Sequence, residues 1–131
     1  MSGETNLDTL LTSMSPNLMD GEYVFCSVQG EYLDFNALSP LASFHEAEGL
    51  TLVITKEMAL ANQLAFESVF RGITLTVHSS LDAVGLTAAV SAKLATNNIS
   101  ANVIAAYYHD HIFVQTEKAE LALTVLNEFC S

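Results

Sequence analysis

Positive charge is scarce in this sequence, which has four Lys and Arg residues against fifteen Asp and Glu residues. The formal net charge is −11 at pH 7. Such a surface repels nucleic-acid phosphates and anionic lipid head groups, so we expect neither nucleic acid nor a membrane as a partner. The acidic residues are scattered along the chain, a pattern typical of a solvated protein surface.

Long apolar runs and cysteines are also scarce. No apolar run reaches the roughly 18 residues that a membrane helix needs, and the N-terminal residues MSGETNLDTL lack the basic and apolar regions of a signal peptide. The two cysteines, Cys26 and Cys130, lie too far apart in the sequence for a zinc motif or a disulfide framework. These absences favour a protein of the reducing cytoplasm.

Sequence motifs of catalysis are missing as well. The chain has no nucleophile elbow, no P-loop, no H-E-x-x-H helix and no C-x-x-C pair. Hydrophobic residues make up 50% of the chain and charged residues 15%, which is ample for a packed core. We therefore expect one domain, or two closely packed small ones, with no enzymatic activity and no cofactor.

The run His109-Asp110-His111 is the one group of residues that suggests a metal site. Two histidines that are two positions apart on a strand point the same way and could supply two ligands. No third ligand can be identified, since His45 and His78 are distant in the sequence. A turn with packed side chains is therefore the favoured interpretation, and we predict no metal site.

The stretch from Gly72 to Val90 changes its hydrophobic period midway. Residues 72–78 alternate apolar and polar side chains, which predicts a half-buried strand. Beyond Ser79-Ser80 the spacing between apolar residues increases to that of Leu86, Val90 and Leu94, which form the apolar stripe of an amphipathic helix. This stretch is thus expected to run from a strand into a helix.

The start of that helix carries two local signals. Ser79 followed by Asp82 resembles a capping box, with Asp in place of the usual Glu. Gly85 would then lie in the first turn, where glycine costs up to ~1 kcal/mol relative to alanine, so we expect another group to approach the backbone there. Free N–H groups at a helix N-terminus also bind anions and carboxylates.

The remaining chain is assigned by the same periodicity and turn signals. We expect helices at 6–14, 56–64 and 117–129, strands at 23–28, 50–55, 101–108 and 111–115, a short return strand at 32–35, mainly loop at 36–48, and a tight turn at 109–110.

The C-terminal half therefore reads strand–helix–strand–strand–helix. With both helices on one face of an antiparallel sheet, this order gives an α+β, ferredoxin-like βαββαβ fold that still needs a fourth strand. We expect that strand to come from 23–28 or 50–55, or otherwise from another subunit. The prediction is two interlocked halves, with domains 1–64 and 65–131.

These elements together resemble the ACT-domain family. The motif Asp82-Ala83-Val84-Gly85-Leu86 matches the D-x-x-G-L-type turn of that family, and residues 97–103 match its polar link into the second strand. The chain is similar to small bacterial ACT proteins related to the tandem ACT modules of aspartokinases, and to half of the arginine sensor CASTOR. The resemblance extends over residues 43–129, which makes 65–131 an ACT domain and 1–64 a degenerate ACT-like half.

The resemblance implies an amino-acid site between modules. Helix N–H groups and serine hydroxyls would take the ligand carboxylate and Asp82 its ammonium, although Asp82 and the serines could equally serve as helix caps, and Gly85 as a packing site. The ligand-binding residues implied are Ser79, Ser80, Leu81, Asp82, Ala83, Val84, Gly85 and Leu86, with Asn102, Val103 and Ile104 opposite.

Two functions follow as hypotheses. The first is a regulatory protein that binds an amino acid at a module interface and reports it by oligomerisation or partner binding, as a homo-oligomer. The alternative is a structural dimerisation module whose exposed sheet edge pairs with a partner chain and which binds no ligand.

Overall fold

The computed structural model describes residues 6–76 and 85–130, and it divides the chain into two compact units. Unit 1 contains Met1–Asp20 and Arg71–Ser131, and unit 2 is Gly21–Phe70. Unit 1 is thus built from both ends of the chain, and unit 2 is an insertion in its sequence. The predicted domain boundary between residues 64 and 65 stays a prediction.

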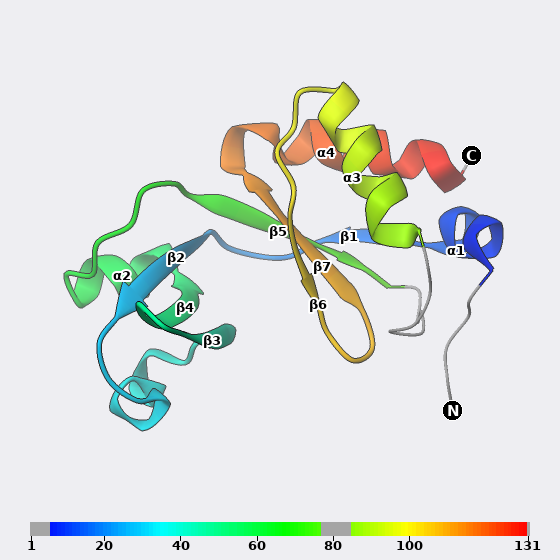
Figure 1. Cartoon of the computed structure of the whole chain (residues 1–131). Helices are drawn as coiled ribbons and strands as arrows, with labels where there is room; N and C mark the ends of the chain where they lie inside the picture. The colour runs from blue at the N-terminus through cyan, green and yellow to red at the C-terminus, as the bar shows by residue number, and fades with distance from the viewer. Residues whose placement is uncertain (1–5, 77–84, 131) are drawn as a thin grey trace. The chain divides into compact units, whose positions relative to one another are not determined.

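Unit 1 has the predicted ferredoxin-like architecture. Its sheet has the order β1-β5-β7-β6, and α3 and α4 cover one face of it (Figure 1). The elements of this unit are α1 (Leu7–Ser13), β1 (Pro16–Leu18), β5 (Phe70–Leu75), α3 (Leu86–Thr96), β6 (Asn102–Ala105), β7 (Asp110–Gln115), α4 (Ala119–Asn127) and the 3₁₀ turns η3 (Thr116–Lys118) and η4 (Glu128–Cys130).

The fourth strand of unit 1 is β1, which pairs antiparallel with β5 in the register Pro16↔Leu75 and Leu18↔Ile73. Its expected origin in the N-terminal half of the chain is confirmed. The two segments named for the role were wrong, because 23–28 and 50–55 both form strands of unit 2. A three-residue strand that starts with proline has no alternating pattern to reveal it, although the first position of a strand is one that proline tolerates.

The apolar stripe of α3 is confirmed by its burial. Leu86, Val90 and Leu94 are 4%, 1% and 0% exposed. Together with residues from α1, β5, β7 and α4 they form the core of unit 1; its other members are Leu10, Met14, Ile73, Leu75, Ile99, Ile112, Val114, Ala119, Ala122, Val125 and Leu126.

Helix α1 forms where it was predicted. The Asn6 side chain caps it by accepting a hydrogen bond from the Thr9 N–H at 3.0 Å. The helix ends at Ser13, shortly before Pro16, as the restriction on residues preceding proline requires. Leu10 and Met14 place its apolar side in the core of unit 1.

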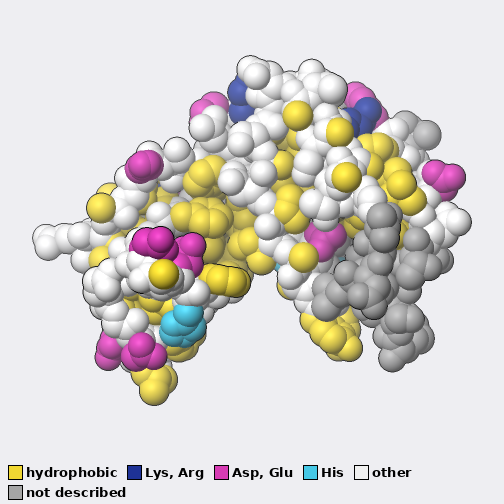
Figure 2. Space-filling model, in the orientation of Figure 1, with side chains coloured by type: hydrophobic (Ala, Val, Ile, Leu, Met, Phe, Trp, Pro, Cys, Tyr) yellow, Lys and Arg dark blue, Asp and Glu magenta, His cyan; other side chains and the backbone are white. Residues whose placement is uncertain are grey.

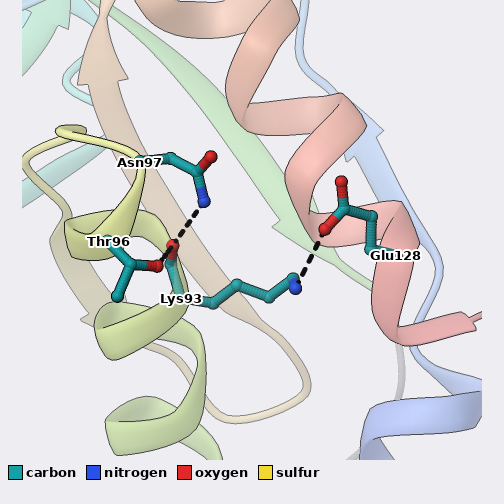
Figure 3. A network of polar contacts seen from close by, with 4 residues as sticks. All are labelled: Lys93, Thr96, Asn97 and Glu128. Atoms are coloured by element: carbon teal, nitrogen blue, oxygen red, sulfur yellow. Dashed lines mark hydrogen bonds and ion pairs between the residues drawn. The ribbon is translucent and has the colours of Figure 1, made fainter.

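Polar contacts join the C-terminal end of α3 to η4 (Figure 3). Lys93 Nζ lies 2.9 Å from Glu128 Oε1 and 5.2 Å from the centre of the Phe129 ring. The Lys93 carbonyl accepts hydrogen bonds from the Thr96 hydroxyl at 2.8 Å and from the Asn97 amide at 3.0 Å. These bonds satisfy a carbonyl that the helix end would leave without a partner.

Unit 2 repeats the same order of elements with a shortened first helix. Its sheet has the order β3-β4-β2, and Tyr23 of β2 also pairs with Phe70, the first residue of β5. Two 3₁₀ turns stand where unit 1 has α3. The elements are β2 (Tyr23–Val28), η1 (Tyr32–Asp34), η2 (Asn36–Leu38), β3 (Ala42–Glu46), β4 (Gly49–Thr55) and α2 (Lys56–Ala61).

Two predictions were wrong in unit 2. Residues 32–35, expected as a return strand, form η1, because Glu31 and Asp34 make a reciprocal capping box that fixes a helical turn. Residues 42–46, expected as loop, form β3. Four of its five residues are exposed, so the strand lacks the alternation of apolar and polar residues that sequence reasoning looks for.

The core of unit 2 lies between β2, β4 and α2. It consists of Val24, Cys26, Val28, Leu50, Leu52, Ile54 and Ala59. Cys26 is buried, at 3% exposure, and burial raises the pKa of its thiol. A thiol in such surroundings is a small hydrophobic side chain rather than a nucleophile.

Acidic side chains are dispersed over the visible surface in the described parts of the chain (Figure 2). No helix in residues 6–76 and 85–130 has both the length and the apolar character that a membrane crossing needs. The surface view thus agrees with the scattered acidic pattern of the sequence.

Candidate functional site

The implied ligand site lies only partly within the described residues. Ser79, Ser80, Leu81, Asp82, Ala83 and Val84 lie outside them. The structure places Gly85 and Leu86 at the start of α3, and Asn102, Val103 and Ile104 on β6, all in unit 1.

Helix α3 starts later than predicted. Its first residue is Leu86 and its N-cap is Gly85, so the prediction that Gly85 lies inside the first turn of a helix beginning near Ser79 was wrong. Gly85 has φ 100° and ψ −16°, a left-handed conformation that glycine adopts without steric cost. Its carbonyl accepts the first helical hydrogen bond, from Ala89 N–H at 2.8 Å. The period change was visible in the sequence, but the exact start was not.

The expected close approach to the Gly85 backbone is made by α1. A Cβ atom at Gly85 would lie 3.2 Å from Leu7 Cδ2, closer than ordinary van der Waals contact. This partner could not be predicted from the sequence, because Leu7 is 78 positions upstream and no local pattern links the two residues. Glycine is therefore favoured at position 85 by the backbone conformation, and a Cβ atom there would in addition make a tight contact with Leu7.

The N-terminus of α3 has no cap from its N-cap side chain, because Gly85 has none. The first N–H groups of a helix have no partner within the helix, and they carry its positive dipole end. Lacking a side-chain oxygen at the N-cap, this helix end favours an incoming carboxylate or another hydrogen-bond acceptor.

Two of the nominated side chains belong to the core. Leu86 is 4% exposed, and Val103 is partly buried against the same cluster. Their side chains are committed to packing, so only their backbone groups remain for a ligand. The sequence predicted the burial of Leu86 from the helical stripe, whereas Val103 was named only through the family resemblance.

Asn102 and Ile104 flank Val103 on β6 and point to the opposite face of the sheet, since side chains alternate along a strand. Asn102 pairs with Phe113 of β7 and donates a hydrogen bond from Nδ2 to the Phe113 carbonyl at 3.1 Å. Ile104 pairs with His111. The three nominated residues of β6 therefore do not face one pocket together.

The β6–β7 connection is longer than the tight turn expected at residues 109–110. β6 ends at Ala105 and β7 begins at Asp110, and Ala106 N–H donates to the His109 carbonyl at 3.1 Å. Tyr107 and Tyr108 lie in this loop, 66% and 63% exposed, with their rings 5.0 Å apart. The strand predicted for 101–108 was thus too long at its end.

Two polar residues of this hairpin, Asp110 and His111, have shifted pKa values. Burial raises the pKa of Asp110, although the positive charges of His111 and His109 oppose that shift. Burial also lowers the pKa of His111, whose Nδ1 lies 3.0 Å from the Thr74 hydroxyl. His109 Nδ1 is buried and has no hydrogen-bond partner among the described residues.

These hairpin residues do not form a metal site with others in the described residues. Within residues 6–76 and 85–130, no group of three or more His, Cys, Asp or Glu side chains is arranged to hold a metal ion. His111 is instead joined to Thr74 of β5.

Comparisons with known proteins identify the family. An ACT-domain profile matches residues 2–71, and a second ACT-domain profile matches residues 67–128. The chain belongs to the ACT-domain family. Its two halves are both ACT domains, and no catalytic domain is evident in either match. A comparison with curated protein sequences gave no match.

Solved structures give the same fold. A Vibrio cholerae protein of unknown function, described as a possible transport protein, is 58% identical, with a TM-score of 0.89 over 95% of this chain and 96% of that one. The ligand-free regulatory subunit of aspartate kinase from Thermus thermophilus is 10% identical, with a TM-score of 0.62 over 92% of this chain and 99% of that one. E. coli aspartokinase III in complex with aspartate and ADP is 11% identical, with a TM-score of 0.64 over 88% of this chain and 33% of that one.

Proposed function

We propose that this ACT protein is a regulatory protein of the cytoplasm that binds an amino acid at the start of α3. The observation that carries the proposal is the N-cap of α3, Gly85, which belongs to the D-x-x-G-L motif and supplies no side-chain hydrogen bond to the helix. The ligand carboxylate would accept hydrogen bonds from the N–H groups of this helix end. Asp82, which precedes Gly85 in the sequence, would take the ammonium group.

The other nominated residues have separate roles in this proposal. Ser79 and Ser80 supply hydroxyl donors to the carboxylate. Leu86 and Val103 contribute their backbone, because their side chains pack in the core. Asn102 holds β6 in register through its bond to Phe113. Leu81, Ala83 and Val84 would line the apolar side of the site, whereas the side chain of Ile104 points to the other face of the sheet and would not contact the ligand.

The fold relatives support a regulatory role for the proposed site. One similar structure is a regulatory subunit of aspartate kinase, and another is an aspartokinase in complex with aspartate. A ligand that binds one assembly of ACT modules better than another shifts the protein toward that assembly by its differential affinity. We expect this chain to report its ligand in that way, as a homo-oligomer.

Calorimetry with each common amino acid tests the proposal. We expect one of them to bind, and Ser80→Ala and Asp82→Ala each to weaken that binding by about tenfold, since a charge-assisted hydrogen bond contributes roughly 1.5–3 kcal/mol. Glu67→Ala, which removes an exposed acid of unit 2, serves as the control and should leave binding unchanged. The absence of binding at millimolar concentration for every amino acid would refute the proposal.

A second candidate function is the structural dimerisation module, and β3 favours it. This strand lies at the edge of its sheet, pairing with β4 alone among the described strands, and its Phe44 is 70% exposed. An edge strand has unpaired N–H and C=O groups that can pair with the same strand of a second copy. Phe44 of each copy would then be covered by the partner.

Sedimentation equilibrium separates the two candidates. Phe44→Lys should convert a dimer formed through β3 into a monomer, whereas Leu60→Lys, on the exposed side of α2, should leave the dimer intact. A dimer that survives Phe44→Lys would exclude β3 as the interface. A dimer that depends on Phe44 in a protein that binds no amino acid would support the structural function alone.

A further inference from the structure

A cleft in unit 2 is lined by none of the residues nominated for the amino acid. It has a volume of about 290 Å³ and is lined by η1, η2 and the chain after α2, through Asp34, Phe35, Ala37, Leu38, Asn62 and Leu64. Binding sites for small molecules start at roughly this volume. All its lining residues belong to unit 2, whereas the site at the start of α3 belongs to unit 1.

The carboxylate of Asp34 is held rigidly at this cleft. Its Oδ2 accepts a hydrogen bond from the Glu31 N–H at 3.0 Å, and the Glu31 side chain accepts one from the Asp34 N–H in return. Gly30 is required next to it, because a Cβ atom there would lie 2.9 Å from Asp34 Oδ2. The second carboxylate oxygen has no partner among the described residues.

The other polar side chain that lines the cleft is the amide of Asn62, at the C-terminal end of α2. Its Nδ2 donates to the Met58 carbonyl at 2.9 Å, which orients the amide and leaves its oxygen as an acceptor. Both polar side chains of the cleft thus offer hydrogen-bond acceptors. A ligand that matches them must be a donor, and Asp34 favours a positively charged one.

No basic side chain lines the cleft among the described residues, so a ligand carboxylate or phosphate would find no cation there. The one basic residue in the sequence of unit 2 is Lys56, whose Nζ lies 3.8 Å from Glu22 Oε1. The net charge of −11 further disfavours anions and attracts cations. These observations exclude an anion and make a zwitterionic amino acid a poor ligand for this cleft.

The remaining lining residues favour an organic ligand over a metal ion. Phe35, Leu38 and Leu64 pack partly buried against the core of unit 2 and present apolar surface. One carboxylate and one amide oxygen are too few ligands for a calcium ion, which takes six to eight oxygens.

We propose that this cleft binds a small alkylammonium ion, with the ammonium group between Asp34 and Asn62 and the carbon chain against Phe35, Leu38 and Leu64. The site is independent of the amino-acid site, so each can exist without the other. An amine that binds here would be a second ligand of this ACT protein, of opposite charge preference to the carboxylate proposed at α3.

Amide NMR spectra of the full chain test the proposal, with 3-methylbutylammonium chloride as the probe. We expect saturable shifts at residues 34–38 and 60–64. The neutral analogue 3-methylbutanol should bind at least about fivefold more weakly, because charge-assisted hydrogen bonds are roughly twice as strong as neutral ones. An amino acid bound at the start of α3 would instead shift resonances at residues 85–89 and 102–104, so the two proposals fail separately.

Two variants with the same charge change complete the test. Asp34→Asn keeps an acceptor for the Glu31 N–H but removes the charge, and it should weaken amine binding at least about fivefold. Glu67→Gln removes an exposed charge that does not line the cleft and should leave the affinity within about twofold, because salt screens exposed charges. Equal effects of the two variants, equal binding of the alcohol, or linear shifts spread over the acidic surface would each overturn the proposal.

A third variant covers the case in which Asp34→Asn unfolds unit 2, as circular dichroism would show. Ala37→Phe fills the cleft and leaves the Glu31–Asp34 capping pair unchanged. We expect it to abolish the shifts at residues 60–64. Amine binding that persists in a folded Ala37→Phe protein would place the amine elsewhere and refute the assignment.

Discussion

Replacing Gly85 with alanine tests whether the start of α3 depends on a left-handed backbone. Gly85 is the N-cap of α3 with φ 100°, and a Cβ atom there would lie 3.2 Å from Leu7 Cδ2. Alanine changes two things at once, because it adds both a steric restriction on φ and a methyl group against α1.

The backbone effect is expected to dominate. Holding an L-residue in the left-handed region costs roughly 1–2 kcal/mol. The contact with Leu7 requires a movement of only a few tenths of an ångström by the end of a partly buried side chain, so we assign it less than about 0.5 kcal/mol. The sum predicts a loss of about 1–2 kcal/mol in the free energy of unfolding, or about 4–8 °C in Tm for a domain of this size.

Urea denaturation followed by far-ultraviolet circular dichroism measures this loss, and two further variants separate its causes. Gly85→Asn adds the same Cβ atom but tolerates the left-handed region, so it should lose less than half as much stability. Leu7→Ala removes the contact, and the double variant with Gly85→Ala should be additive within about 0.5 kcal/mol. A Gly85→Ala protein as stable as the wild type, or an asparagine variant as damaged as the alanine one, would refute the reasoning.

Three further predictions concern unit 1. Gly72→Ala should lower the free energy of unfolding, measured by urea denaturation, by about 1–3 kcal/mol, because its Cβ atom would lie 3.0 Å from the fully buried Phe113 ring. A loss below about 0.5 kcal/mol would contradict this prediction. Asp110 has a raised pKa in the folded state, so its protonation adds stability that is lost as pH rises through that pKa. The Tm gain of Asp110→Asn over the wild type should therefore be larger at pH 7 than at pH 4. A Tm gain that is the same at both pH values would count against this prediction. Glu128→Gln should lower the free energy of unfolding by about 0.2–1 kcal/mol, because it removes the half-exposed ion pair between Lys93 and Glu128. The loss of stability should shrink in about 0.5 M salt, which screens the two charges. A loss that is independent of salt would indicate another cause.

Long periodic segments of this chain were predictable because their side chains report the structure locally. The stripe Leu86, Val90 and Leu94 identified α3, and β2 has the bounds that were predicted. The aspartate and glycine of the family turn identified the ACT domain. In each case the evidence lies within a dozen neighbouring residues, so the sequence alone contains it.

The remaining elements depend on partners far away in the sequence. β1 is a strand only because β5, more than fifty positions later, pairs with it. β3 has exposed side chains on both faces and is defined by its pairing with β4. The contact of Leu7 with Gly85 is likewise tertiary. Local propensity and periodicity contain no information about such pairings, which is why these features were missed or misassigned.

The two modules differ at the point where the first strand of each is followed by a helical segment, and this difference underlies the two ligand proposals. After its first strand, unit 1 forms an eleven-residue helix whose N-cap is a glycine, so the N–H groups at its start receive no side-chain oxygen from that position. After its first strand, unit 2 forms a short 3₁₀ turn at which the Asp34 N–H donates to the Glu31 side chain and the Asp34 carboxylate accepts from the Glu31 N–H. The first arrangement attracts a carboxylate and the second presents one. A carboxylate ligand and an amine ligand should therefore bind the two modules without competing, and the Kd of either one, measured by titration, should be unchanged by a saturating concentration of the other.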